Sequence, residues 1–321
     1  MHHLMDSFRF FTLTALLAVC FGILPTARVG AEVAEQEVVL SLQERERIAA
    51  AVPRKAPAAA KSPRKLLVVS LHVRDGQRLR GHTSIAYGNL AIELMGKQTG
   101  AYTATFSDDL SIFSPERLRE FDAVCFNNTA GVLFEDPRLK KSLLDFIADG
   151  KGFVGIHAAA ATFVQWPRYD QWPEFGRMLG ATENGGHPWK PDETITLQLD
   201  EPDHPINAAF GGKGFHVRDE VFQFQEPYSR DRLRVLLSID TERTDMDPAR
   251  RFLPERFEDK DFAISWIRKH GEGRVFYSSL GHNPHIFWNR AVLGHFLAGI
   301  QFALGDLKAD AKPSSVAEPG E

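Results

Sequence analysis

Short apolar runs alternate with helical segments through the first half of the chain. Each run is continuous and rich in Val, Ile, Leu or Phe, as expected of strands buried on both faces of a sheet. The segments between them carry apolar residues at helical spacing, with capping residues at their starts. We predict strands at residues 66–71, 102–106, 123–126 and 152–156, with helices at about 84–97, after 114, and from 137 to 148. This alternation predicts an α/β fold with a doubly wound, mainly parallel sheet and helices on both faces.

The second half of the chain follows a different pattern. Residues 194–199 and 221–224 predict antiparallel strands at an edge of the sheet. Further strands are predicted at 233–239, 262–267 and 274–280, and an amphipathic helix from Phe287 to Ala303 closes the domain. The sheet is therefore expected to carry an antiparallel edge extension.

The two ends of the chain differ in composition from the middle. Residues 10–24 are apolar and follow Arg9, and Val29, Gly30 and Ala31 are small residues suited to signal peptidase. The apolar run of about 15 residues is short for a membrane span, which needs about 20. We expect residues 1–31 to be a signal peptide that is cleaved after Ala31, which leaves a periplasmic or secreted protein with no membrane span. Residues 32–64 read as a helical segment and a Pro/Ala/Lys-rich linker, 65–305 as the α/β domain, and 306–321 as a disordered tail.

The charge balance and the cysteine content argue against a nucleic-acid partner and against an intrachain disulfide. The 321 residues carry a formal charge of -4, and the isoelectric point is about 6.3. This balance lacks the basic excess of a nucleic-acid-binding protein. The two cysteines are Cys20, in the signal segment, and Cys125, in a predicted strand, so the mature chain should form no intrachain disulfide.

Histidines carry most of the chemical signal. His157 and His282 each directly follow a predicted strand, at the sheet edge where ligands of open α/β sheets bind. His82, His187 and His285 lie in loops that could reach the same edge. With Asp219 or Glu220, such imidazoles could hold Zn, Ni or Fe, or act as acid and base near neutral pH. The spacing does not separate these alternatives. Taken singly, the other histidines, including His72, are interpreted as ordinary surface or hydrogen-bonded residues.

Aromatic side chains suggest a class of ligand, and missing motifs exclude others. A tryptophan ring can pack on the C–H face of a sugar, although core packing is the common role of any single tryptophan. The chain has five, Trp166, Trp172, Trp189, Trp266 and Trp288. It has no dinucleotide or phosphate-binding glycine motif, no H-E-x-x-H, no paired C-x-x-C and no G-x-S-x-G.

At these residues the chain resembles the ThuA-like (trehalose utilisation) family. The matching segments include RGHTSIAYG near Arg80, FDAVCFNNTAG around Asn127, GKGFVGIHAAAATF, GGHP, DHPI, RDEVFQF and FAISWIRKHGEGRVFYSSLGH. The resemblance covers residues 65–305. It implies a flavodoxin-like sheet with the fold of the class I glutamine amidotransferases. It also implies a role in sugar catabolism, where such proteins accompany dehydrogenases that make 3-keto sugars.

The resemblance also bears on the reaction. Glutamine amidotransferases place a nucleophilic Cys on the sharp turn that His157 occupies here, so thioester chemistry lacks its essential group. Many relatives follow G-I-H-A-A with Thr-Asp, whereas this chain has Ala160, Ala161 and Thr162, so an adjacent carboxylate to orient His157 is missing.

Two functions follow as hypotheses. The first is an exported enzyme acting on a sugar or 3-keto sugar, as an isomerase or hydrolase, by histidine acid–base or metal-assisted chemistry. Its expected catalytic residues are His157, His282 and Glu220. Its expected substrate-binding residues are Arg80, His82, Asn127, His187, Trp266 and His285. The alternative is a non-catalytic carbohydrate-binding module. The sequence leaves open a divalent metal and a homo-oligomer, and a purely structural domain would leave these histidines unconnected.

Overall fold

The central sheet of the protein has nine strands among the residues that the computed structural model describes, which are 38–164, 172–183 and 186–316. Their order across the sheet is β10-β9-β12-β13-β14-β7-β5-β1-β4. The strands span β1 Lys65–Val69, β4 Thr103–Phe106, β5 Ala123–Asn127, β7 Gly152–Ile156, β9 Thr194–Leu199, β10 Phe215–Arg218, β12 Arg234–Ile239, β13 Ala263–His270 and β14 Gly273–Ser278.

One half of the sheet is parallel. Strands β14, β7, β5, β1 and β4 all run in the same direction, with Cys125 opposite both Val68 and Val154. Strands β5 and β7 are buried along their whole length, because helices cover both faces of the sheet. The doubly wound α/β fold predicted from the alternating pattern is confirmed.

The other half is antiparallel. Strands β13, β12, β9 and β10 each run opposite to their neighbours, which confirms the antiparallel edge extension. The prediction for residues 221–224 was wrong in detail. The edge strand is β10, and Phe224–Gln225 is a separate strand, β11, paired with β8 at Thr182–Glu183. The apparent alternation misled because all four side chains from 221 to 224 are buried.

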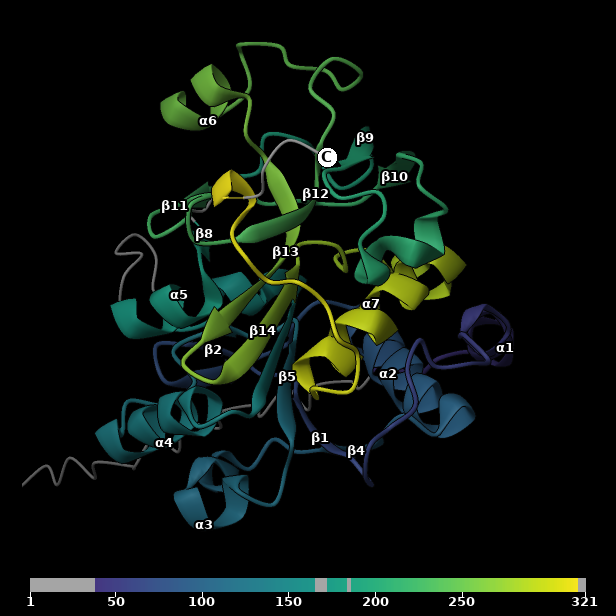
Figure 1. Ribbon diagram of the computed structural model, residues 1–321. Coiled ribbons are helices and arrows are strands. Elements are labelled where there is room, and N and C mark those ends of the chain that lie inside the picture. The colour runs from purple at the N-terminus through teal and green to yellow at the C-terminus, as the bar shows by residue number, and fades with distance from the viewer. Residues whose placement is uncertain (1–37, 165–171, 184–185, 317–321) are drawn as a thin grey trace, which may run out of the picture. The chain divides into compact units, whose positions relative to one another are not determined.

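Helices form a layer on each face (Figure 1). Helices α1 (Leu42–Ala51), α2 (Ile85–Thr99) and α7 (Arg290–Ala303) pack on one face, and α3 (Pro115–Leu118), α4 (Pro137–Ala148) and α5 (Pro173–Leu179) pack on the other. Helix α6 is Pro254–Asp259, and short 3-10 helices are η1 Leu110–Phe113, η2 His157–Ala161, η3 Pro205–Phe210, η4 Pro284–Trp288 and η5 Ser314–Val316. The alanines after His157 form the 3-10 turn η2.

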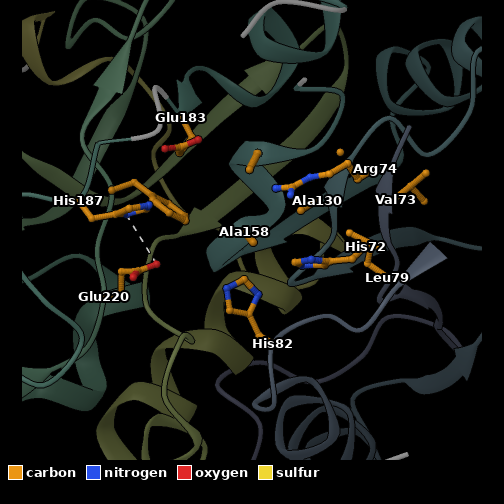
Figure 2. A pocket seen from close by; sticks show the side chains of 13 residues that line it. His72, Val73, Arg74, Leu79, His82, Ala130, Ala158, Glu183, His187 and Glu220 are labelled. Carbon is orange, nitrogen blue, oxygen red and sulfur yellow. Dashed lines mark ion pairs between the residues drawn. The ribbon is translucent and has the colours of Figure 1, made fainter. Parts of the chain in front are cut away.

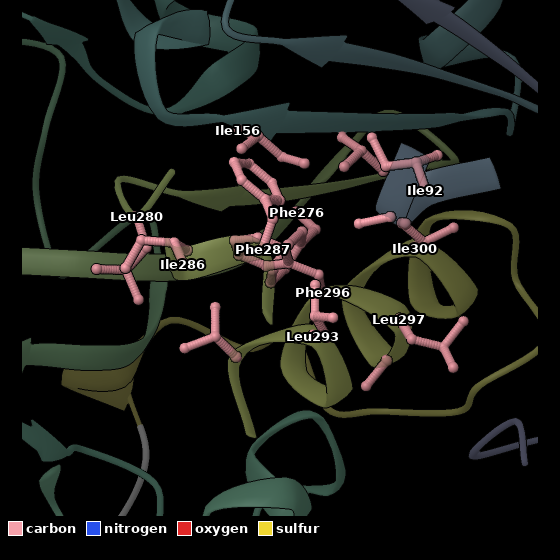
Figure 3. Close-up of a cluster of buried hydrophobic side chains, with 14 of the residues drawn as sticks. Ile92, Ile156, Phe276, Leu280, Ile286, Phe287, Leu293, Phe296, Leu297 and Ile300 are labelled. Carbon is pink, nitrogen blue, oxygen red and sulfur yellow. The ribbon is translucent and has the colours of Figure 1, made fainter. Parts of the chain in front are cut away.

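Helix α7 is seated closely on the sheet (Figure 3). Phe287, Phe296 and Ile300 are fully buried in the core between this helix and the strands. A Cβ atom added to Gly299 would lie 2.5 Å from the Phe276 ring, so only glycine permits the observed spacing between α7 and β14. This packing fixes the segment from β14 to α7, which carries His282.

The expected linker and tail are both partly packed against the domain. The backbone of Ala58 exchanges two hydrogen bonds with the side chain of Gln301. The buried Asp306 carboxylate pairs with Arg64, at 2.7 Å from Nη2. The predictions of a linker and of a disordered tail are therefore corrected for residues 56–64 and 306–316, which pack against the domain. The charged groups of the two segments pair with each other, which a composition argument does not reveal.

The predicted signal peptide, residues 1–31, lies outside the described residues. Within the part of the chain that is described, no helix is long and apolar enough to cross a membrane.

Candidate functional site

The candidate site lies at the carboxyl ends of the parallel strands. Strand β7 ends at Ile156 and delivers His157, and β14 ends at Ser278, four residues before His282. Strand β1 leads into a small sheet of β2 (His72–Arg74), β3 (Gln77–Leu79) and β6 (Ala130–Gly131), and His82 follows β3. Three separate segments of the chain therefore bring imidazoles to one edge of the sheet.

His157 is held in a strained conformation by several contacts. Its φ is 48°, in the left-handed region that non-glycine residues rarely adopt. Its Nδ1 donates to the Ser279 carbonyl at 2.8 Å, and the Tyr277 hydroxyl donates to its backbone carbonyl at 2.8 Å. The Phe222 ring stacks on the imidazole with centroids 4.6 Å apart. The ring is fully buried and its orientation is fixed.

Glu220 is the carboxylate that faces the histidines. Its Oε1 lies 3.3 Å from His282 Nδ1, 3.7 Å from His187 Nδ1 and 3.8 Å from His157 Nε2. His157 Nε2 and His282 Nδ1 are themselves 3.2 Å apart. The rings of His82 and His157 have centroids 5.0 Å apart. One carboxylate thus lies at the centre of a histidine cluster.

Asp219 has a different role from its neighbour. Its buried carboxylate accepts backbone N–H groups of Gly281 at 2.6 Å, His282 at 3.3 Å and Asn283 at 2.7 Å. Gly281 has a φ of 131°, which gives the loop the shape needed to present three N–H groups together. The alternation of the two side chains therefore gives one acid that anchors the His282 loop and one that meets the imidazoles.

The protonation of the cluster follows from burial and proximity. Burial, together with the neighbouring imidazoles, lowers the pKa of His157 and brings that of His82 to about 3. Burial also disfavours a charge on His282, but the hydrogen bond to Glu220 and its negative charge outweigh this and raise the His282 pKa. Desolvation raises the pKa of Asp219 to about 7 despite its three N–H donors. Neutral imidazoles therefore lie beside one imidazole that favours a proton.

A pocket opens beside this cluster (Figure 2). Its cavity volume is about 180 Å³, below the roughly 300–1,000 Å³ of pockets that enclose drug-sized ligands, so it suits a ligand smaller than these. Its lining includes His72, His82, His187, Glu220 and Phe222. Figure 2 shows the side chains of His187 and Glu220 on one side of the pocket and those of His72 and His82 on another. Polar groups from four segments of the chain therefore converge on one cavity.

Four of the predicted site residues are not part of the cluster. Asn127 is fully buried, and its amide donates to the Ile85 carbonyl and to Asn89. Arg80 is exposed, and His285 hydrogen-bonds the backbone of Arg218. Trp266 is fully buried, and its indole N–H donates to the Leu179 carbonyl. Its predicted role as a sugar-stacking platform is therefore wrong, because its ring is part of the core.

The other tryptophans also give little support to sugar stacking. Trp172 and Trp189 are buried, and Trp288 packs against Tyr87. Trp166 lies outside the described residues.

The sequence analysis missed two contributors. The ring of His72 lies 5.0 Å from that of His82, edge to face, and lines the pocket. It comes soon after the strand at 66–71, so the rule that singled out His157 could have found it. Phe222 lines the pocket and supports His157, but only the tertiary structure shows this.

Comparison with known families identifies the chain. The model of the ThuA family, described as trehalose utilisation, matches residues 70–303. The chain belongs to the ThuA family. This membership indicates a carbohydrate-related role. A comparison with curated proteins gave no match.

Solved structures of ThuA-like proteins share the fold. One from Bacteroides uniformis is 20% identical with a TM-score of 0.57, over 75% of this chain and 93% of that one. One from Parabacteroides merdae is 15% identical with a TM-score of 0.51, over 76% and 90% of the two chains. At these identities, the likeness shows that the ThuA domain here has the architecture of those proteins.

Proposed function

We propose that this protein is an enzyme that acts on a sugar or 3-keto sugar in the histidine pocket. The observation that carries the proposal is Glu220, which lines the pocket and lies within 3.8 Å of ring nitrogens of three histidines. A site that only binds a sugar needs hydrogen bonds, but it does not need a carboxylate coupled to several imidazoles. The carbohydrate class of the substrate comes from the family.

The chemistry that suits these groups is proton transfer next to a carbonyl. A 3-keto sugar has acidic C–H bonds beside its carbonyl group, and a carboxylate or neutral imidazole can remove such a proton. Glu220 and His187 line the pocket and can reach a bound sugar, whereas His157 is fully buried behind them. We therefore propose that Glu220 and His187 transfer the proton. His157 is a positioning residue that holds Glu220 and His282 in place.

Glutamine hydrolysis is not part of the proposal. Cys125 is fully buried in β5, and burial raises the pKa of its thiol. Such a thiol forms no nucleophilic thiolate at neutral pH. The turn after β7, where a nucleophile would be needed, carries His157.

The test is a turnover assay on a panel of glucosides and their 3-keto forms. Glu220→Gln should lower kcat by about 10² to 10⁴, the usual contribution of general acid–base catalysis, and should weaken ligand binding little. Glu116→Gln is the matched control, since Glu116 is an exposed side chain on α3. If the wild type binds panel sugars by calorimetry but converts none, the protein is a carbohydrate-binding module instead.

We also propose that the protein is exported, on the strength of its N-terminal sequence alone. Expression in a Gram-negative host should give a periplasmic chain whose first residue is Glu32. Recovery of the uncleaved chain from the cytosol would contradict this.

A further inference from the structure

We propose that His82, His157, His282 and Glu220 bind one divalent transition-metal ion. Each of the four residues offers one ligand atom, and these atoms all lie within 4.8 Å of one another. His157 and His282 follow strands β7 and β14 of the parallel half of the sheet. His82 follows β3 of the small sheet, and Glu220 comes from the segment between β10 and β11. The inference concerns the same pocket as the proposed function but stands on this geometry alone.

The distances between the donor atoms suit a metal ion. Metal–ligand bonds of about 2.1 Å in a tetrahedral site place neighbouring ligand atoms roughly 3.4 Å apart. Here the separations are 3.2 Å between His157 Nε2 and His282 Nδ1, and 3.3 Å and 3.8 Å from these nitrogens to Glu220 Oε1. One ion can therefore contact all three atoms with only small movements of the side chains.

The tautomer of His157 also favours metal binding. A carbonyl oxygen can only accept, so the 2.8 Å contact to the Ser279 carbonyl places the proton on Nδ1 of His157. Its Nε2 then carries a lone pair directed at the cluster. A backbone carbonyl that fixes the far nitrogen of an imidazole is the usual support of a metal-binding histidine. Asp219 provides comparable support for the loop that carries His282.

Unpaired nitrogens in the same place give independent support. Nδ1 of His82 and Nε2 of His72 are buried and have no hydrogen-bond partner among the described residues. A buried polar atom without a partner destabilises the fold, because it has lost its hydrogen bonds to water. A bound ion that takes the Nδ1 lone pair of His82 would remove that cost, whereas His72 is not among the four proposed ligands and keeps its unpaired nitrogen.

The donor types restrict the ion. Three imidazoles and one carboxylate suit borderline ions such as Zn²⁺, Fe²⁺, Co²⁺ or Ni²⁺, while Mg²⁺ and Ca²⁺ prefer oxygen ligands throughout. Because Glu220 lines the pocket, an ion that it holds would face the pocket's contents.

The experiment uses the chain purified without a polyhistidine tag, stripped with a chelator and titrated with Zn²⁺ in a calorimeter. We expect one equivalent per chain, the same stoichiometry by elemental analysis after gel filtration, and a rise in the unfolding temperature. His82→Ala and Glu220→Gln should each weaken Zn²⁺ binding by about 100-fold or more. His216→Ala is the matched control, because His216 is exposed on the edge strand β10, and its affinity should equal that of the wild type.

The outcomes separate this inference from the proposed function. Absence of stoichiometric Zn²⁺ binding, or equal affinity in wild type and both variants, overturns the metal site. Circular dichroism of the stripped variants shows whether a loss of binding reflects unfolding, and if either variant is unfolded, His282→Asn provides the same comparison. Stoichiometric Zn²⁺ binding without turnover of any sugar supports the metal site and contradicts the proposed enzymatic function. Turnover that survives complete removal of metal supports the enzymatic function and contradicts a role for the metal in it.

Discussion

Replacing His295 with glutamine tests how burial controls protonation away from the site. His295 lies on α7, where it is fully buried. Its Nε2 is 2.8 Å from the Ser265 hydroxyl, and its Nδ1 is 3.2 Å from the Ile206 carbonyl. The pair resembles a serine–histidine dyad, but both groups are inaccessible. Burial lowers the pKa of His295 to about 3 from an ordinary value of 6.5.

The sign and the size of the effect follow from this shift. The unfolded chain binds the His295 proton as the pH falls through 6.5, while the folded chain does not until about pH 3. Stability is therefore lost as the pH falls below 6.5, by about 1.4 kcal/mol per pH unit for this residue. Between pH 7 and pH 5 the loss is about 2 kcal/mol. The glutamine variant cannot titrate and should escape this part of the loss.

The assay is urea unfolding of both proteins at pH 7 and pH 5. At pH 7 the variant should be less stable by about 1–3 kcal/mol, because a buried hydrogen bond is lost. At pH 5 that deficit should shrink by about 2 kcal/mol. Gln301→Ala is the control on the same helix, since it removes two partly buried hydrogen bonds to Ala58 and no titrating group, and its deficit should not depend on pH. An equal His295→Gln deficit at both pH values would refute the reasoning.

Three further predictions concern single contacts, each measured by chemical unfolding. Asp219→Asn places an amide N–H₂ against backbone N–H groups and should lower the free energy of unfolding at pH 8 by about 1–3 kcal/mol. The control Asp203→Asn changes an exposed side chain and should lower it by under about 0.5 kcal/mol. Equal effects would contradict the anchoring role of Asp219. Asp306→Asn breaks the buried pair with Arg64 and should cost about 3 kcal/mol, whereas a neutral result would mean that the tail does not contribute to the fold. Gly299→Ala forces a methyl group into the Phe276 ring and should cost about 1–3 kcal/mol, so a gain in stability would contradict the close seating of α7.

Local pattern was enough to predict the main strands of the parallel half and the edge where the site lies. Continuous apolar runs such as 123–126 and 152–156 are typical of strands in the middle of a parallel sheet, and parallel strands end at a common edge. His157 and His282 were therefore predictable as neighbours before any distance was known. The family motifs around the same residues pointed to the same fold.

Other features depend on contacts between segments far apart in the sequence. No local signal distinguishes Asp219 from Glu220, and the choice is made by the 281–283 backbone that Asp219 binds. Trp266 and Asn127 are of types common in sugar sites, yet packing places both in the interior. His72 and His82, by contrast, are brought together locally by the β2–β3 hairpin, which the sequence analysis did not predict.

The sequence by itself determined which residue types reach the site edge, because hydrophobic periodicity is a property of neighbours along the chain. Only the tertiary structure decided which of them meet, how they are protonated and whether solvent reaches them. Those properties depend on distance and burial, and both arise when strands from separate crossovers pack side by side. The same four residues that the sequence offers as acid, base or ligand become a set of donor atoms within 4.8 Å of one another through that packing.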